Sequence, residues 1–150
     1  MIKKIFAVIL MMFFCDTAYA SNTATQTIKI KVEAISVISV SGDPGILLIS
    51  DGRTSATDDS TTYAITTNET NKKIIAKIDK ELPEGLTLKV HLDPPEGAVA
   101  SEVALNTSPQ DVVTDISRVA ESGMKILYTL TSDGRPAEDS VEVVFTIVDG

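Results

Sequence analysis

Apolar and polar residues alternate with a period of two over most of the chain after residue 20. Successive side chains of a β-strand point to opposite faces, so this period is typical of strands with one buried and one exposed face. We find no convincing helical spacing in this region. The pattern predicts strands at residues 27–34, 62–67, 73–79, 86–92, 99–105, 112–119, 124–131 and 141–148.

The first of these predicted strands carries its apolar side chains on one face. They are Ile28, Ile30, Val32 and Ala34, and polar residues fill the alternate positions. Between Ala34 and Val40 the apolar residues move to odd-numbered positions and back to even ones. We therefore expect a β-bulge, or a strand that changes sheets, between Ala34 and Ser39.

Turn-forming residues separate the predicted strands. A tract rich in Ser, Thr, Asp and Gly from Ser50 to Thr62 predicts an exposed loop, and Asn68–Lys72 predicts a hairpin connection. Short strands with turns about every 8–12 residues predict an all-β fold, an immunoglobulin-like antiparallel β-sandwich of the Greek-key type. A closed barrel is the alternative. The chain has no tryptophan and only one cysteine, so the hallmarks of antibody domains are missing.

The first 20 residues have the features of a secretory signal peptide. Lys3 and Lys4 precede the apolar run 5–14, and Ala18-Tyr19-Ala20 forms a small-residue cleavage site. We predict cleavage before Ser21 and export to the periplasm, the cell surface or the medium. The apolar run is shorter than the about 20 residues that span a bilayer, so we expect no membrane insertion. The predicted organisation is a leader at 1–20, an N-terminal strand or donor extension at 21–34, and a β-sandwich domain at 35–150.

Charge and cysteine content narrow the range of functions. Without the predicted leader, the chain has 11 basic and 20 acidic residues and a net charge of −9. Such a surface repels nucleic acid and anionic lipid, so neither is an expected partner. The only cysteine, Cys15, lies in the predicted leader, so no disulfide is expected after cleavage. Phe13 and Phe14 before it disfavour the alternative of a lipid attachment site.

No cluster of residues predicts a reaction, and we expect no cofactor. His91, the only histidine, falls on the polar face of the predicted strand 86–92, and no nucleophile-elbow motif accompanies it. Two acidic groups offer oxygen ligands for calcium, but their spacing matches no calcium-binding motif. They are Asp51, Asp58 and Asp59 in one predicted loop, and Asp133, Glu138 and Asp139 in another. We therefore predict a protein that is not an enzyme and has no metal site.

Four tracts, in this order, resemble the cysteine-free colonisation-factor pilins that alternate chaperone–usher systems assemble. They are Thr27–Ala34, Ile46–Gly52, Thr66–Ile78 and Val143–Gly150. Such pilins have an immunoglobulin-like sandwich that lacks its last strand, and the N-terminal extension of the next subunit fills the gap.

The resemblance implies which residues bind a partner. The donor would be residues 25–34, with Ile28, Ile30, Val32 and Ala34 entering the gap of the next subunit. The closing strand 141–148, with Val143, Phe145 and Ile147, would border the gap and be held by a periplasmic chaperone. The implied partners are further copies of the chain or other pilus subunits.

Two features of the sequence leave an alternative open. No glycine or proline hinge separates residues 27–34 from the apolar residues that follow, and about ten apolar segments are enough to complete a sandwich within one chain. Residues 27–34 would then pair with their own sheet. We therefore predict an exported, non-catalytic structural subunit of a fimbrial or similar surface assembly. The alternative is a monomeric exported binding module whose acidic loops contact a ligand, with calcium as an aid.

Overall fold

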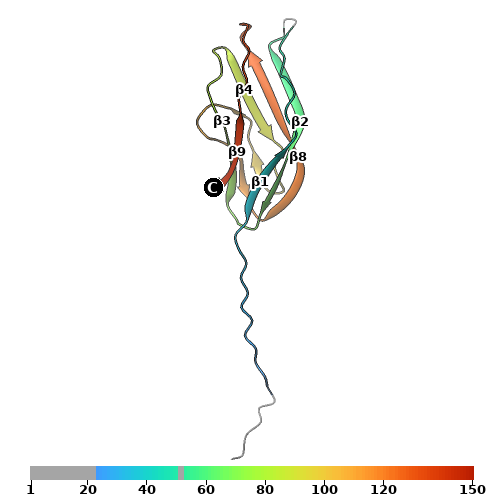
Figure 1. The fold of residues 1–150 in the computed structure, drawn as a ribbon, viewed down its shortest axis with the longest axis vertical. Coiled ribbons are helices and arrows are strands. Elements are labelled where there is room, and N and C mark those ends of the chain that lie inside the picture. The colour runs from blue at the N-terminus through green and yellow to red at the C-terminus, as the bar shows by residue number, and fades with distance from the viewer. Residues whose placement is uncertain (1–22, 51–52) are drawn as a thin grey trace, which may run out of the picture. The chain divides into compact units, whose positions relative to one another are not determined.

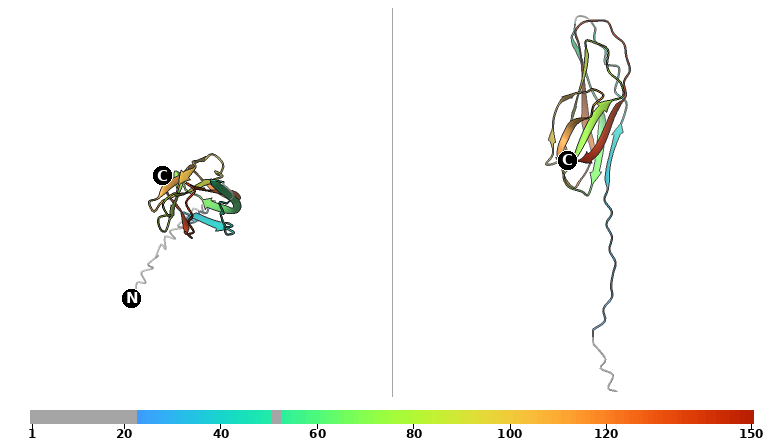
Figure 2. Two further views of the ribbon diagram at one scale, coloured as in Figure 1. Left: turned by 90° about the horizontal axis from the view of Figure 1, so that it is seen from above. Right: turned by 90° about the vertical axis from the view of Figure 1, so that its left-hand side faces the viewer.

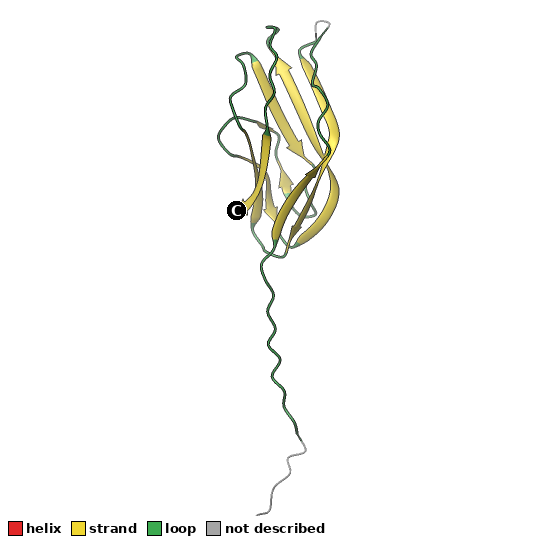
Figure 3. Ribbon diagram, in the orientation of Figure 1, coloured by secondary structure: helices red, strands yellow, loops and turns green. Residues whose placement is uncertain are grey.

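The computed structural model describes residues 23–50 and 53–150. The predicted leader and cleavage site, and Asp51 of the two acidic groups considered for calcium, lie outside the described residues. The chain divides after Val32 into two units. All strands of the described chain belong to the second unit, and the described residues form no helix (Figure 3). Accordingly, no helix that could cross a membrane occurs among them.

Nine strands build the second unit. They are β1 (Ser36–Ser41), β2 (Ser55–Thr67), β3 (Lys72–Ile78), β4 (Leu86–Leu92), β5 (Val99–Ala100), β6 (Val103–Ala104), β7 (Gln110–Ile116), β8 (Val119–Ser132) and β9 (Val143–Asp149). A five-stranded sheet has the order β1-β2-β8-β4-β6, and a four-stranded sheet has the order β5-β7-β3-β9. All pairings are antiparallel. The predicted all-β sandwich of two antiparallel sheets is confirmed (Figure 1).

The core lies between the two sheets and contains alternate residues of their strands. In β3, buried residues occupy every second position, and Ile74, Ala76 and Ile78 belong to one core cluster with buried residues of β2, β4 and β8 in the other sheet. Tyr63 is the largest of the fully buried side chains. Its hydroxyl donates a hydrogen bond of 2.5 Å to the carbonyl oxygen of Asp93, which provides the buried hydroxyl with a partner.

The prediction of an exposed loop from Ser50 to Thr62 was wrong for most of that tract. Residues 55–61 form the first part of β2 and pair with β8, from Ser55 opposite Thr131 to Thr61 opposite Ile126. A register shift after Asp58 interrupts this ladder. Ser, Thr and Asp favour turns when only local sequence is considered. Here the long strand β8 offers backbone partners along the whole tract, and pairing with it outweighs the local preference.

The prediction of a hairpin at Asn68–Lys72 was also wrong. β2 and β3 flank this connection, but they belong to different sheets. The connection therefore crosses from one layer of the sandwich to the other. A polar turn with Asn71 at a φ of 54° fits both a hairpin within one sheet and a connection between two sheets. The sequence of the turn therefore does not distinguish these two connections.

The expected irregularity between Ala34 and Ser39 does not occur in β1. Its register with β2 is unbroken from Ser36 opposite Thr67 to Ser41 opposite Thr62. Residues 27–34, predicted as a strand, form none. Because β1 keeps one phase, Ile38 lies opposite the buried Ile65, whereas Ile35 and Val37 are exposed.

Candidate interaction site

The two sides of the sandwich end differently. On one side the edge strands are β5 and β6, which have only two residues each. The core residues on the neighbouring segments are covered: Val90 and Val112 are 0% exposed and Leu105 is 5% exposed. The edge residues Ala100 and Val103 pack against this core and are partly covered. Short edge strands offer little backbone for another chain to pair with. This side of the domain, formed by β5 and β6, is the sealed side.

The opposite side ends in two longer strands, β1 and β9. Within residues 23–50 and 53–150, β9 pairs only with β3, and β1 pairs only with β2. Figures 1 and 2 draw β1 and β9 side by side, and Cα atoms of the two strands come within 8 Å of each other. They belong to different sheets, so each keeps one edge without a neighbouring strand. We call this side, formed by β1 and β9, the open side.

The inward-facing side chains of the open side are apolar and only partly covered. On β9 they are Val143, Phe145 and Ile147, which pack against the core without being buried. On β1, Val40 lies opposite the buried Tyr63 but is 44% exposed. On the next strand inward, β3, the core-facing residues are buried: Ile74, the pairing partner of Ile147, is 0% exposed. The apolar interior therefore extends to this side without a strand that covers it.

The structure places the predicted partner-binding residues in two groups. Val143, Phe145 and Ile147 line the open side on β9. Ile28, Ile30 and Val32 belong to the first unit of the chain and are 73–84% exposed. Ala34 belongs to the second unit and is also exposed.

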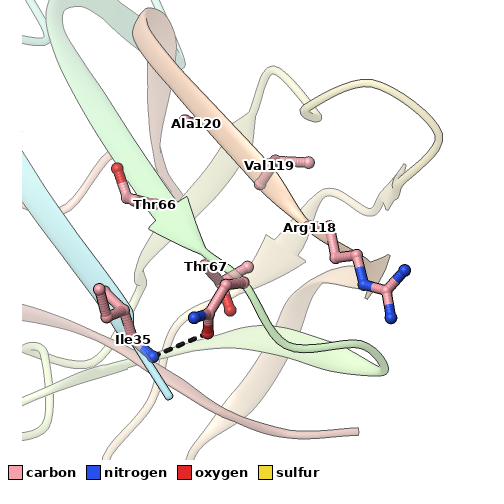
Figure 4. A pocket seen from close by; sticks show the side chains of 7 residues that line it. Ile35, Thr66, Thr67, Arg118, Val119 and Ala120 are labelled. Carbon is pink, nitrogen blue, oxygen red and sulfur yellow. Dashed lines mark hydrogen bonds between the residues drawn. The ribbon is translucent and has the colours of Figure 1, made fainter. Parts of the chain in front are cut away.

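Asn68, at the end of β2, holds the backbone that leads into β1. Its Nδ2 donates a hydrogen bond of 2.7 Å to the carbonyl oxygen of Glu33. The backbone N–H of Ile35 donates to Asn68 Oδ1 at 2.8 Å; this bond is the dashed line that starts at the labelled Ile35 in Figure 4. The carbonyl oxygen of Ile35 accepts from Asn68 N at 3.1 Å. We call these three bonds the Asn68 clamp. Sequence reasoning missed it, because Asn68 was assigned to a hairpin turn.

A polar network joins β1, β3 and β9 at the same end of the domain. Lys72 Nζ lies 2.9 Å from Glu69 Oε2 and 2.5 Å from Asp149 Oδ1. Ser36 Oγ donates a hydrogen bond of 2.7 Å to the same Glu69 oxygen. The Lys72 side chain is only 11% exposed, so its charge depends on these partners. We call this group the Lys72 network.

The charges of the Lys72 network shift one another's pKa. The hydrogen bond from Lys72, followed by that from Ser36, lowers the pKa of Glu69. The hydrogen bond and charge of Lys72 also lower the pKa of Asp149. In turn, hydrogen bonds to Asp149 and Glu69 raise the pKa of Lys72. Each group is thus held in its charged form in the folded protein.

Comparison of the chain with protein-family models, with curated proteins and with solved structures finds no match. Nothing in these comparisons bears on the resemblance to pilins. The geometry of the described residues is therefore the basis for a functional proposal.

An open hollow of about 500 Å³ lies beside the Asn68 clamp (Figure 4). Its apolar lining comes from Ile35, Val119 and Ala120, and its polar lining includes Thr67 and Asn68. The Thr67 hydroxyl is within hydrogen-bond distance of Ser36 Oγ, and the Asn68 amide is part of the clamp. The Thr67 and Asn68 side chains of the hollow thus have partners within the fold, and Thr66 and Arg118 also line it.

The candidate residues for catalysis and metal binding are not brought together. His91 lies on the non-core face of β4, paired with Leu127. The described residues contain no group of three or more His, Cys, Asp or Glu side chains that could hold a metal ion.

Several of the acidic loop residues have partners within the fold. The hydroxyl of Ser60 donates to Asp58 Oδ1 at 2.7 Å, and this bond is the main cause of the lowered pKa of Asp58. Three further carboxylates pair with basic side chains. The pairs are Asp59 with Lys125, Asp133 with Arg135, and Asp139 with Lys80.

Proposed function

We propose that the protein is an exported, non-catalytic structural subunit that assembles with further copies of itself by strand complementation. One observation carries this proposal. The chain has an open side with half-covered apolar residues and a strand edge without a neighbour, and it also has an N-terminal segment with exposed, alternating apolar residues. An added strand covers apolar side chains and pairs with free backbone groups at once. We call residues 25–34 the donor segment.

The donor segment and β9 have matching side-chain spacing. The segment carries apolar residues at every second position from Ile28 to Ala34. The open side carries Val141, Val143, Phe145 and Ile147, also at every second position, packed against the core. Both sets span about 20 Å in extended conformation, because a strand rises about 3.3 Å per residue. A strand in the right register therefore presents its whole apolar face to the core.

Burial of the apolar side chains of the donor segment supplies the driving force for assembly. Ile28, Ile30 and Val32 are large apolar side chains that are almost fully exposed. Covering a side chain of this size contributes about 1.5–3 kcal/mol. Ordering the backbone opposes this gain, and new ladder hydrogen bonds along β9 add to it.

Charge also favours association between copies. The donor segment carries Lys29, Lys31 and Glu33, a net charge of +1, which leaves −10 for the rest of the chain after residue 20. A basic segment is attracted to an acidic domain, and this attraction accelerates encounter.

The strand order supports an immunoglobulin-like Greek-key sandwich that lacks its last strand. The order β1-β2-β8-β4 corresponds to strands A, B, E and D of such a fold, and the paired β3 and β9 correspond to C and F. Strand G would lie beside F, at the free edge of β9. The resemblance to colonisation-factor pilins implies the same missing strand. A periplasmic chaperone that covers this edge before assembly is the second partner that we propose.

The experiment uses the chain from Ser21 onward, followed by sedimentation velocity over a range of concentrations. We expect the wild type to form oligomers and Ile30→Asp to remain monomeric, because a carboxylate on the apolar face cannot enter the core. Thr27→Asp is the matched control, since it adds the same negative charge on the polar face and keeps assembly. A peptide with the sequence of residues 25–34 should bind to the Ile30→Asp chain.

Two results would contradict the proposal. One is a wild-type chain that stays monomeric at every concentration. The other is an Ile30→Asp chain that assembles as well as Thr27→Asp. At a concentration at which both variants are monomeric, circular dichroism should show the same strand content, because neither residue belongs to a strand of the single chain.

A further inference from the structure

The Asn68 clamp extends the pairing of β1 and β2 beyond its last residue pair. The ladder ends where Ser36 lies opposite Thr67. One residue further, the Asn68 side chain binds the carbonyl oxygen of Glu33 and the N–H of Ile35, the groups on either side of Ala34. The amide thus acts as an additional strand partner. It keeps residues 33–35 extended beside the end of β2.

Because the Asn68 clamp holds residues 33–35, it determines where the donor segment can reverse its direction. The segment leads directly into β1. To enter the open side of its own domain, it must lie beside β1 and β9 and run opposite to β1, so the chain must turn back just before Ser36. Residues 33–35 cannot form that turn while the clamp holds them extended. The reversal would have to lie within residues 28–32.

The residues at 28–32 are poorly suited to a turn. Tight reversals between strands favour Gly, Asn or Asp, which accept a positive φ, and the sequence there is Ile-Lys-Ile-Lys-Val. β-branched side chains are strained in that backbone conformation. A turn at this point would also use Ile30 and Val32, two of the side chains that would have to fill the open side.

We propose that Asn68 is a positioning residue that keeps the donor segment out of its own domain and directs it to the open side of a second copy of the chain. This inference rests on the proposed function and names the partner. It separates assembly between chains from the self-complemented alternative, which the sequence leaves open.

The chemistry of the amide makes the proposal testable with single substitutions. Asn68→Ala removes both side-chain bonds but keeps the backbone bond from Asn68 N to the Ile35 carbonyl oxygen, so β1 stays in place. Asn68→Asp keeps an acceptor for Ile35 N but has no donor for the Glu33 carbonyl oxygen. Asn106→Ala is the matched control. Asn106 Oδ1 also accepts a backbone N–H, that of Ser108, in a loop far along the chain from the donor segment.

The test is hydrogen–deuterium exchange of the chain from Ser21 onward, at a range of concentrations, combined with sedimentation velocity. In the wild type and in Asn106→Ala, protection of residues 25–32 should rise with concentration, together with oligomer formation. In Asn68→Ala, these residues should also be protected in the monomer, independently of concentration. The self-inserted fraction should rise about tenfold, because two hydrogen bonds of ordinary net strength are lost. For Asn68→Asp, the protection of residues 25–32 in the monomer should lie between that of the wild type and that of Asn68→Ala.

Three outcomes would overturn the inference. If Asn68→Ala behaves like Asn106→Ala, Asn68 does not position the segment, while assembly by strand complementation stands. If the wild-type monomer already protects residues 25–32, the segment enters its own domain despite the clamp. If no variant protects these residues at any concentration, the proposed function itself fails and this inference fails with it.

Discussion

The sealed side and the open side of the sandwich differ in how much backbone their edge strands offer for pairing with another chain. On the sealed side, the edge strands β5 and β6 are only two residues long, and their inward residues Ala100 and Val103 are partly covered. On the open side, β1 and β9 have six and seven residues, and their inward apolar side chains are half-covered.

Because the two sides differ, long edge strands without a neighbour are not a necessary feature of a small sandwich. Proteins that remain monomeric shorten or cover their edge strands to avoid pairing with other chains. This domain does so on one side only. The open side therefore has the features of an interface, and the following variants test how far the two sides differ.

The largest expected effect comes from two isoleucines that pair with each other, Ile74 on β3 and Ile147 on β9. Ile74→Ala should lower the free energy of unfolding by about 2–5 kcal/mol, because its side chain is fully buried. Ile147→Ala should cost roughly half as much, since the half-covered side chain has less contact to lose. Urea unfolding in the monomeric Ile30→Asp background measures both. Equal losses of unfolding free energy would mean that Ile147 is covered as completely as Ile74, so that the open side has no uncovered apolar face.

A smaller effect is expected from the Lys72 network, which joins the two edge strands of the open side. Lys72→Met leaves the carboxylates of Glu69 and Asp149 without their cation and should lower the thermal midpoint. Lys73→Met is the control. Lys73 pairs with Asp111 at 3.1 Å on the outer face of the sheet, where water screens the pair. Differential scanning calorimetry should show a larger decrease of the thermal midpoint for Lys72→Met than for Lys73→Met. Equal decreases would contradict this prediction.

The same network predicts a pH dependence. Glu69 and Asp149 have lowered pKa values in the fold, so they stabilise it above about pH 4, where the unfolded chain is also ionised. This stabilisation is lost as the pH falls through their folded pKa. Lys72 has a raised pKa, so its contribution is complete below about pH 10 and is lost as the pH rises through the folded value. Urea midpoints between pH 2 and pH 7 should fall less steeply for Glu69→Gln than for the wild type.

The smallest effect is expected on the sealed side. Glu102, between β5 and β6, lies 3.0 Å from Lys89 on β4, and both side chains are largely exposed. Glu102→Gln should change the free energy of unfolding by less than about 0.5 kcal/mol, because an exposed ion pair contributes little. A loss above 1 kcal/mol in urea unfolding would show that charge, rather than apolar cover, seals this side.

Much of the fold and part of the candidate site were predictable from local patterns. The period of two located most strands, and it placed Leu88, Val90 and Leu92 on the buried face of β4. The same reasoning placed Val143, Phe145 and Ile147 on one face of β9. These predictions succeeded because strand geometry alone fixes which residues share a face.

The failures concern contacts that local patterns do not encode. The tract 55–61 looks like a loop until β8 pairs with it, and Asn68–Lys72 looks like a hairpin although it connects two sheets. Asn68 resembles any turn asparagine, because its role depends on Glu33 and Ile35, more than thirty positions earlier. The change of phase after Ala34 reflects two apolar residues, Ile35 and Val37, that remain exposed.

The sequence by itself determined the alternation that makes strands, the acidic surface, and the apolar face of residues 28–34, because each depends only on residue type and spacing. The tertiary structure decided which strands pair, which edges stay free and where the chain is held before β1. These features arise from contacts between distant residues, such as Lys72 with Asp149, 77 positions apart. Spacing along one strand fixes the face that is buried, but only the packed domain determines which partner covers it.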